Sequence, residues 1–259
     1  MSTSDFEKEL NLLSPLIQKR YLAQPEDSKH KAAKPTHIAS MIDHTLLKPN
    51  VLTEDVISLC KEAREHRLFS VCIPPSHIPI AKKELRESDV KICTVVGFPL
   101  GTQTSASKTF EARNAIEIGA DEIDMVLNVS ALKSKKYDLV FKEIETIKQV
   151  CSGKTLKVIL ETSYLTKEEI ILSCIIVRAA GADFVKTSTG FAPTGATKED
   201  IELMRKVVGK NFGVKASGGI RTKEDAEIMI TAGASRLGCS ASLQIIGASK
   251  QTNSEQGNY

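Results

Sequence analysis

Short apolar runs alternate with longer amphipathic stretches along most of the chain. The short runs are rich in Val, Ile and Leu and end in polar or glycine-containing turns, which is typical of buried strands. This pattern predicts strands at residues 40–43, 70–73, 91–96, 122–127, 156–160, 184–187, 213–216 and 236–238.

The longer stretches place apolar residues at the spacing of one helix face. They predict helices at residues 53–65, 105–118, 137–150, 166–180, 197–208 and 222–232. The last three begin with the same pattern, a threonine followed three positions later by Glu or Asp, at Thr166, Thr197 and Thr222. Such a threonine caps a helix by accepting a hydrogen bond from a free backbone amide. Glycine recurs at helix ends, as Gly119, Gly181 and Gly233.

Alternation of strands and helices implies parallel strand pairing, because each crossover returns the chain to the same end of the sheet. Eight such units favour an α/β protein with a closed (β/α)8 TIM barrel over an open doubly wound sheet. The sequence has no G-x-G-x-x-G turn after a strand, which weakens the dinucleotide-binding alternative.

The two ends of the chain differ from this repeat. Residues 6–22 predict one amphipathic helix, and residues 24–35 are polar and rich in Lys, Ala and Pro. We therefore expect an extra N-terminal helix and polar linker at residues 1–35, a barrel domain at 36–250 and a flexible C-terminal tail at 251–259.

The 259 residues carry a net charge of +3, and charged residues of both signs make up 26% of the chain. Because the signs are mixed, we expect no nucleic-acid partner, while a small anionic substrate stays compatible. The longest apolar run, residues 170–177, is shorter than the roughly 20 residues that span a bilayer, so we expect no membrane partner.

Six cysteines lie at irregular spacings, with no C-x-x-C pair and no secretory leader, which predicts a reduced, cytoplasmic protein. No histidine has metal-ligand spacing with another His or Cys, so we expect no metal site.

Three lysines in predicted strands follow one another at intervals of 29 residues: Lys157, Lys186 and Lys215. A single lysine in a strand is more often an edge residue or one whose ammonium group reaches water. Three in the same context indicate one site, because barrel strands bring equivalent positions together. Burial and a nearby cation both lower the pKa of a lysine, which leaves more of it as the neutral, nucleophilic amine. This suggests Schiff-base chemistry on a carbonyl.

Glycine and serine occur together after the last two predicted strands, as Gly218-Gly219 and as Ser240. In TIM barrels these loops often bind phosphate, because glycines let backbone amides approach an anion and a helix N-terminus follows. Gly218 and Gly219 alone fit a tight turn equally well. The second loop favours phosphate.

Other polar residues lie near the ends of the first, second and fourth predicted strands: Asp43, Cys72 and Asp124. A carboxylate near lysines can transfer a proton, but a structural salt bridge is the simpler interpretation of Asp124 taken alone. A packed thiol is the default interpretation of Cys72.

Several motifs together resemble the deoxyribose-phosphate aldolases, class I aldolases with a TIM barrel, over residues 38–241. They are IDHTLLKP, VCIPP, TVVGFPLG, GADEIDMVLN, LKVILET, GADFVKTSTGF, VKASGGIRT and GCSA. The resemblance implies reversible cleavage of 2-deoxy-D-ribose 5-phosphate to acetaldehyde and D-glyceraldehyde 3-phosphate in deoxyribonucleoside catabolism. It also implies that no metal or organic cofactor takes part.

The resemblance gives roles to individual residues. Lys186 forms the Schiff base, Lys215 is the neighbouring cation that lowers the pKa of Lys186, and Asp124 relays protons with Lys215. The phosphate is surrounded by Thr189, Gly190, Gly218, Gly219 and Ser240. The pocket is lined by Asp43, Cys72 and Lys157.

Some members of this family end in a tyrosine that assists proton transfer at the imine carbon. Tyr259, the last residue of this chain, is therefore a further catalytic candidate, although a frayed terminus without function is the simpler interpretation. Some members have lysine in place of Phe191 and serine in place of Ala241, which implies a weaker hold on phosphate here. Members commonly form dimers or tetramers, so we expect a homo-oligomer.

Two other functions stay open. Another class I sugar-phosphate aldolase, or a transaldolase, would use a barrel lysine and a phosphate loop equally well. A non-catalytic barrel would bind a sugar phosphate without turnover, but such a protein gains nothing from two ammonium groups that repel each other.

Overall fold

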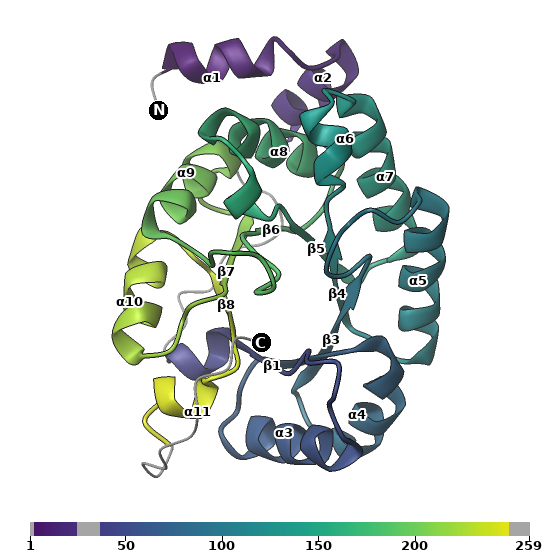
Figure 1. The fold of residues 1–259 in the computed structure, drawn as a ribbon, viewed down its shortest axis with the longest axis vertical. Coiled ribbons are helices and arrows are strands. Elements are labelled where there is room, and N and C mark those ends of the chain that lie inside the picture. The colour runs from purple at the N-terminus through teal and green to yellow at the C-terminus, as the bar shows by residue number, and fades with distance from the viewer. Residues whose placement is uncertain (1–2, 25–36, 249–259) are drawn as a thin grey trace.

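The chain forms a closed barrel of eight parallel strands, as a computed structural model that describes residues 3–24 and 37–248 shows (Figure 1). Strand order follows sequence order, and β1 closes the barrel by pairing with both β2 and β8. The strands are β1 (Ile42–Thr45), β2 (Ser70–Ile73), β3 (Lys91–Val96), β4 (Glu122–Val126), β5 (Thr155–Ile159), β6 (Phe184–Lys186), β7 (Gly213–Ser217) and β8 (Arg236–Cys239). The predicted (β/α)8 barrel is confirmed.

Helices form a ring around the strands (Figure 1). They are α3 (Thr53–Glu65), α4 (Ile78–Glu84), α5 (Ser105–Ile118), α7 (Tyr137–Val150), α8 (Lys167–Ala179), α9 (Lys198–Val208) and α10 (Lys223–Ala232). Shorter helices follow two strands, α6 (Val129–Lys133) and α11 (Ser242–Ile245), and 3-10 turns cover Ile38–Met41, Pro75–His77 and Thr162–Tyr164. No helix in the described ranges is both long and apolar enough to cross a membrane.

The repeated threonine pattern does start helices. Thr166 Oγ1 accepts a hydrogen bond from the amide of Glu169 at 3.3 Å, and the Glu169 carboxylate accepts one from the Thr166 amide at 2.9 Å. Thr222 caps α10 in the same reciprocal way with Asp225, and at the start of α9 Thr197 Oγ1 accepts a hydrogen bond from the Asp200 amide. The predicted glycines follow α5, α8 and α10 with positive φ angles, a conformation that costs glycine little.

The N-terminal helix predicted over residues 6–22 is instead two helices, α1 (Thr3–Leu10) and α2 (Pro15–Ala23). Pro15 has no backbone N–H and disfavours helical geometry at the residue before it, and Ser14 accordingly has a φ of −63° and a ψ of 153°. Both helices lie against α8 outside the ring (Figure 1). The predicted linker and tail fall outside the described residues.

The first strand was predicted two residues too early. Residues 38–41 form a 3-10 turn, in which the Ser40 hydroxyl and amide both donate to the His37 carbonyl oxygen, at 2.8 and 3.2 Å. A serine side chain that bonds to nearby backbone competes with strand pairing. The strand therefore starts at Ile42, where pairing with Leu237 of β8 begins.

The barrel interior is polar, and the apolar core lies between the strands and the helices. Residues that alternate along the strands are buried apolar side chains on the outer face, among them Ile123, Met125, Val158, Val185, Val214 and Leu237. The residues between them bring charge inside, each with at most 6% of its surface exposed: Asp43, Glu122, Asp124, Lys157, Lys186, Lys215 and Arg236. Branched apolar residues usually fill the interior of a TIM barrel. In this barrel, paired charged side chains occupy that interior instead.

Candidate active site

The barrel places the three lysines on consecutive strands. Lys157 is in the middle of β5, Lys186 is the last residue of β6 and Lys215 is in the middle of β7. Lys186 and Lys215 are register partners of β6 and β7. The 29-residue spacing thus brings the three ammonium groups to one place.

Asp124 of β4 contacts all three lysines. Its Oδ1 lies 2.9 Å from Lys157 Nζ, and its Oδ2 lies 2.8 Å from both Lys186 Nζ and Lys215 Nζ. Lys186 and Lys215 therefore share one carboxylate oxygen. Such an arrangement allows a proton to pass between an amine and a carboxylate without diffusion.

Two more carboxylates and an arginine extend these contacts toward the amino-terminal end of the strands. Asp43 bonds Lys215 through Oδ2 and lies 2.9 Å from Arg236 Nη1 through Oδ1. Glu122 Oε2 lies 2.5 Å from Lys157 Nζ and 2.9 Å from the same arginine nitrogen. We call these residues the ion-pair network: Asp43, Glu122, Asp124, Lys157, Lys186, Lys215 and Arg236.

The two aspartates of the network have lowered pKa values. Burial alone raises the pKa of a carboxyl group, but Lys157, Lys186 and Lys215 outweigh burial and hold the pKa of Asp124 well below its usual value. Burial acts in the same way on Asp43 and is again outweighed, mainly by Lys215, so its pKa is also lowered. Both side chains are therefore carboxylates at neutral pH.

Lys157 and Lys215 have raised pKa values. Burial lowers the pKa of a lysine, but Asp124 and Asp43 outweigh burial at Lys215 and raise its pKa. At Lys157 burial is outweighed first by Asp124, and the pKa is raised well above its usual value. Both side chains are therefore ammonium groups at neutral pH.

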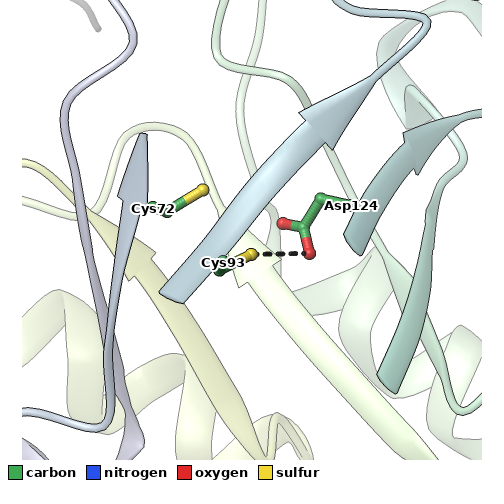
Figure 2. A group of neighbouring side chains, drawn as sticks. All are labelled: Cys72, Cys93 and Asp124. Atoms are coloured by element: carbon green, nitrogen blue, oxygen red, sulfur yellow. Dashed lines mark hydrogen bonds between the residues drawn. The ribbon is translucent and has the colours of Figure 1, made fainter. Parts of the chain in front are cut away.

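Two thiols lie beside Asp124, on β2 and β3 (Figure 2). Cys93 Sγ donates to Asp124 Oδ1 at 3.3 Å, as the dashed line in Figure 2 shows. A hydrogen bond from Cys93 lowers the pKa of Cys72, while burial and that same bond raise the pKa of Cys93 well above its usual value. Asp43, Cys72 and Lys157, which the resemblance assigns to the pocket lining, are thus fully buried around Asp124.

The ligand atoms of Cys72, Cys93 and Asp124 lie within 4.8 Å of one another, close enough to share a metal ion. However, the ammonium groups of Lys157 and Lys186 already contact the two oxygens of Asp124. A metal ion would have to displace them, so the chemistry of the site favours lysines over a bound cation.

A cavity of about 190 Å³ opens between the loops after β6, β7 and β8. Its lining includes four of the five residues expected around the phosphate: Gly190, Gly218, Gly219 and Ser240. Gly218 and Gly219 both have positive φ angles. A Cβ atom on Gly195 would lie 2.2 Å from the carbonyl oxygen of Gly218, so the two loops meet through glycine backbone. Arg221 also lines this cavity and adds a cationic side chain.

Thr189, the fifth expected residue, lies elsewhere. Its hydroxyl donates to Glu161 Oε2 at 2.5 Å, and it lines a second cavity of about 170 Å³ together with Phe191. Glu161 is buried with a φ of 58°, a conformation uncommon outside glycine, and burial raises its pKa. The structure therefore joins Thr189 to Glu161, and the 190 Å³ cavity is lined by the other four expected residues.

Sequence reasoning missed five residues near the site: Cys93, Glu122, Glu161, Arg221 and Arg236. Glu122 was available from strand periodicity, because it lies two positions before Asp124 and faces the same side. Arg221 stood in the loop already read as a phosphate loop. Arg236 and Glu161 carry no local signal of their roles. Tyr259 lies outside the described residues.

A parallel (β/α)8 barrel with a lysine at the carboxyl end of a strand, beside a second ammonium group and a carboxylate, has the arrangement of a barrel aldolase. A family model, DeoC/LacD family aldolase, matches residues 37–249, and the chain belongs to this family.

Similar proteins agree with this assignment. The deoxyribose-phosphate aldolase of Caldanaerobacter subterraneus subsp. tengcongensis is 60% identical over 213 residues, which cover 81% of this chain and 92% of that protein. Deoxyribose-phosphate aldolase 1 of Vibrio vulnificus is 57% identical over 213 residues, covering 82% and 97%. A tetrameric deoxyribose phosphate aldolase structure from Aeropyrum pernix has a TM-score of 0.77 and 30% identity, covering 96% of this chain and 98% of that chain.

Proposed function

We propose that this aldolase cleaves 2-deoxy-D-ribose 5-phosphate reversibly to acetaldehyde and D-glyceraldehyde 3-phosphate, through a Schiff base on Lys186, in deoxyribonucleoside catabolism. The names of its relatives support the substrate. The observation that carries the mechanism is the pair of contacts from Lys186 and Lys215 to one oxygen of Asp124. The names of the relatives and the contacts to Asp124 favour this activity over that of a transaldolase and over binding of a sugar phosphate without turnover.

Lys186 is the best-placed nucleophile of the three lysines. Among the described residues its Nζ contacts one carboxylate, whereas Lys157 contacts three and Lys215 two. Lys186 therefore has the fewest ion pairs of the three lysines. As the last residue of β6, it also lies at the carboxyl end of the barrel, where substrates enter.

In the cleavage direction, the Lys186 amine attacks the aldehyde carbon C1, and loss of water leaves an imine. A base removes the proton of the C3 hydroxyl, the C2–C3 bond breaks, and its electron pair moves into the imine to give an enamine. Glyceraldehyde 3-phosphate leaves. Protonation of the enamine carbon and hydrolysis then release acetaldehyde. Asp124 and Lys215 relay these protons, since both contact each other and Asp124 contacts Lys186.

The substrate phosphate binds in the 190 Å³ cavity. Backbone amides of Gly218 and Gly219, the Ser240 hydroxyl and the Arg221 guanidinium are the groups suited to an anion there. Gly190 lets the backbone of the loop after β6 approach the phosphate. Thr189 supports this loop through Glu161.

The protein assembles as a homo-oligomer, a dimer or a tetramer, and works in the cytoplasm. The tetrameric relative supports assembly. All six cysteines are free, buried thiols, which supports a reducing compartment.

Reductive trapping tests the function. Incubation with acetaldehyde and borohydride, followed by peptide mass spectrometry, should place an ethyl group on Lys186 and abolish turnover. Lys186→Arg should prevent both, and Lys157→Arg serves as a control for labelling of a buried lysine. An ethyl group on another lysine contradicts the assignment. Efficient use of dihydroxyacetone as the donor, in place of acetaldehyde, would instead favour a transaldolase or another class I aldolase.

A further inference from the structure

Two members of the ion-pair network lie far from the proposed phosphate cavity, at the amino-terminal end of the barrel. Glu122 is the first residue of β4 and Arg236 is the first residue of β8. We propose that Arg236 and Glu122 are positioning residues that set the pH at which Lys186 becomes a nucleophile. This inference rests on the proposed function, because it concerns the same lysine.

The arginine is fixed in place by charge and by aromatic rings. Arg236 Nη1 lies 2.9 Å from both Asp43 Oδ1 and Glu122 Oε2. Its guanidinium carbon lies 3.4 Å from the ring centroid of Phe69 and 5.3 Å from that of Phe184. A guanidinium held between carboxylates and aromatic faces keeps its charge at all accessible pH values.

Two series of contacts join this arginine to the nucleophilic lysine. The first runs through Asp43 and Lys215 to Asp124, and the second runs through Glu122 and Lys157 to the same aspartate. Asp124 Oδ2 then contacts the nucleophile at 2.8 Å. A change of charge at Arg236 therefore alters the electrostatic potential at Lys186, because the groups between them are buried and in direct contact.

The network combines cations and carboxylates in a buried volume. The cations are Lys157, Lys186, Lys215 and Arg236, and the carboxylates are Asp43, Glu122 and Asp124. Because none has more than 6% of its surface exposed, screening by water and salt is weak. Removing a positive charge favours protonated Lys186, and removing a negative charge favours the neutral amine.

Cys72 of β2 and Glu161 after β5 interact electrostatically with the nucleophile itself. Cys93 of β3 and Cys239 of β8 interact instead with its network neighbours Lys157 and Lys215. They contribute to the starting protonation state of the lysine. Substitution of Arg236 or Glu122 leaves all four in place. A comparison of such variants therefore isolates the charge that was removed.

The test is the pH dependence of kcat/KM for cleavage, whose acidic limb reports the loss of the proton from the nucleophile in the free enzyme. Arg236→Met should move the acidic midpoint upward and Glu122→Gln should move it downward. Each shift should be on the order of one pH unit, the effect of a unit charge at about 10 Å with an effective dielectric constant of about 20. The double variant should return to the wild-type midpoint.

Two controls separate charge from shape. Arg236→Lys keeps the charge and should keep the midpoint, even with a lower rate. Lys108→Met removes another fully buried cation, one that pairs with Glu143 at 2.8 Å on the outer side of the barrel, and should leave the midpoint in place. Circular dichroism and thermal unfolding establish that each variant is folded.

The outcomes are distinct. Arg236 and Glu122 contact each other, so a purely structural role predicts that both single variants lose rate at an unchanged midpoint, and this result would overturn the inference. If Arg236→Met does not fold, the isosteric Glu122→Gln decides by its downward shift alone. Absence of a trapped imine on wild-type Lys186 refutes the proposed function as well. A trapped imine with coincident midpoints refutes only the inference.

Discussion

Lys215 is a cation that the fold keeps charged. Its ammonium group contacts Asp43 and Asp124, and both raise its pKa against the effect of burial. A permanent positive charge beside Lys186 disfavours a second one, and the shared Asp124 oxygen gives the two lysines a common proton acceptor. The neighbouring cation that the resemblance implies is therefore present in the geometry, whereas its effect on rate stays a prediction.

Substitution of Lys215 measures that effect. Lys215→Met removes the cation and the relay, so we expect kcat/KM to fall by about 10² to 10⁴ and the pH optimum to move upward. The measurement is a pH–rate profile, with Lys108→Met as the control for loss of a buried lysine. Near-normal activity with an unchanged profile would remove Lys215 from the mechanism.

Ser240 tests the proposed phosphate site through one exposed side chain. Ser240→Asp places a negative charge among Gly190, Gly218 and Gly219. Repulsion of the anion should raise KM for the phosphorylated sugar by tenfold or more, while KM for unphosphorylated deoxyribose changes little. Ser240→Asn is the matched neutral control. An equal effect on both sugars would mean that the phosphate binds elsewhere.

At the scale of elements, the sequence predicts what local chemistry determines. Threonine caps and glycine ends located the helices, because both act within one turn of the chain. All eight strands were found, and the first was displaced because Ser40 closes a turn that periodicity does not reveal. The N-terminal helix was drawn through Pro15, although proline rules out a continuous helix there.

The site was partly predictable for a similar reason. Lys157, Lys186 and Lys215 share a repeated context, so their convergence follows from barrel geometry. The role of Arg236 depends on contacts with Asp43, 193 positions away in sequence, and no local pattern encodes such a pair. The roles of such residues depend on contacts between strands that are far apart in sequence. Only the closed barrel brings those strands together.

Helix α2 lies outside the barrel, and Tyr21 attaches it to the surrounding helices. The Tyr21 hydroxyl donates to the carbonyl oxygen of Val207 at 2.5 Å, and Arg178 lies 4.8 Å over its ring. Tyr21→Phe keeps the ring and removes the hydroxyl, so it should lower the free energy of unfolding by about 1–3 kcal/mol. Urea denaturation measures this. The turnover number should not change, because α2 packs on α8 rather than on the strands; a large loss of turnover would contradict this separation.

At the scale of the whole molecule, the ion-pair network links stability to pH. Asp43 and Asp124 have lowered pKa values, so their stabilising effect is complete above the unfolded value of about 3.9 and is lost as pH falls through the folded values. Lys157 and Lys215 have raised pKa values, so their effect is complete below about 10.4 and is lost as pH rises through the folded values.

We therefore expect a plateau of stability between about pH 5 and 10, with losses on both sides. The urea midpoint measured at half-unit steps of pH checks this. Asp43→Asn should flatten the acidic side, because it removes one of the carboxylates that must be protonated. A midpoint that rises as the solution is made more acidic than pH 4 would be incompatible with the paired carboxylates.

The signs of charge in the ion-pair network divide along the chain. Strands β1 to β4 supply the three carboxylates, and strands β5 to β8 supply the four cations. Each half of the barrel is therefore a poor partner for a copy of itself, since like charges would meet without water, and a good partner for the other half.

If the chain is divided at the exposed turn around Lys135, between α6 and α7, the two fragments should recombine as a one-to-one pair and not as homodimers. Co-expression and size-exclusion chromatography test this, with Glu122→Lys in the first fragment as the variant that should weaken recombination. In that case the charges of the ion-pair network would also determine which half of the molecule pairs with which.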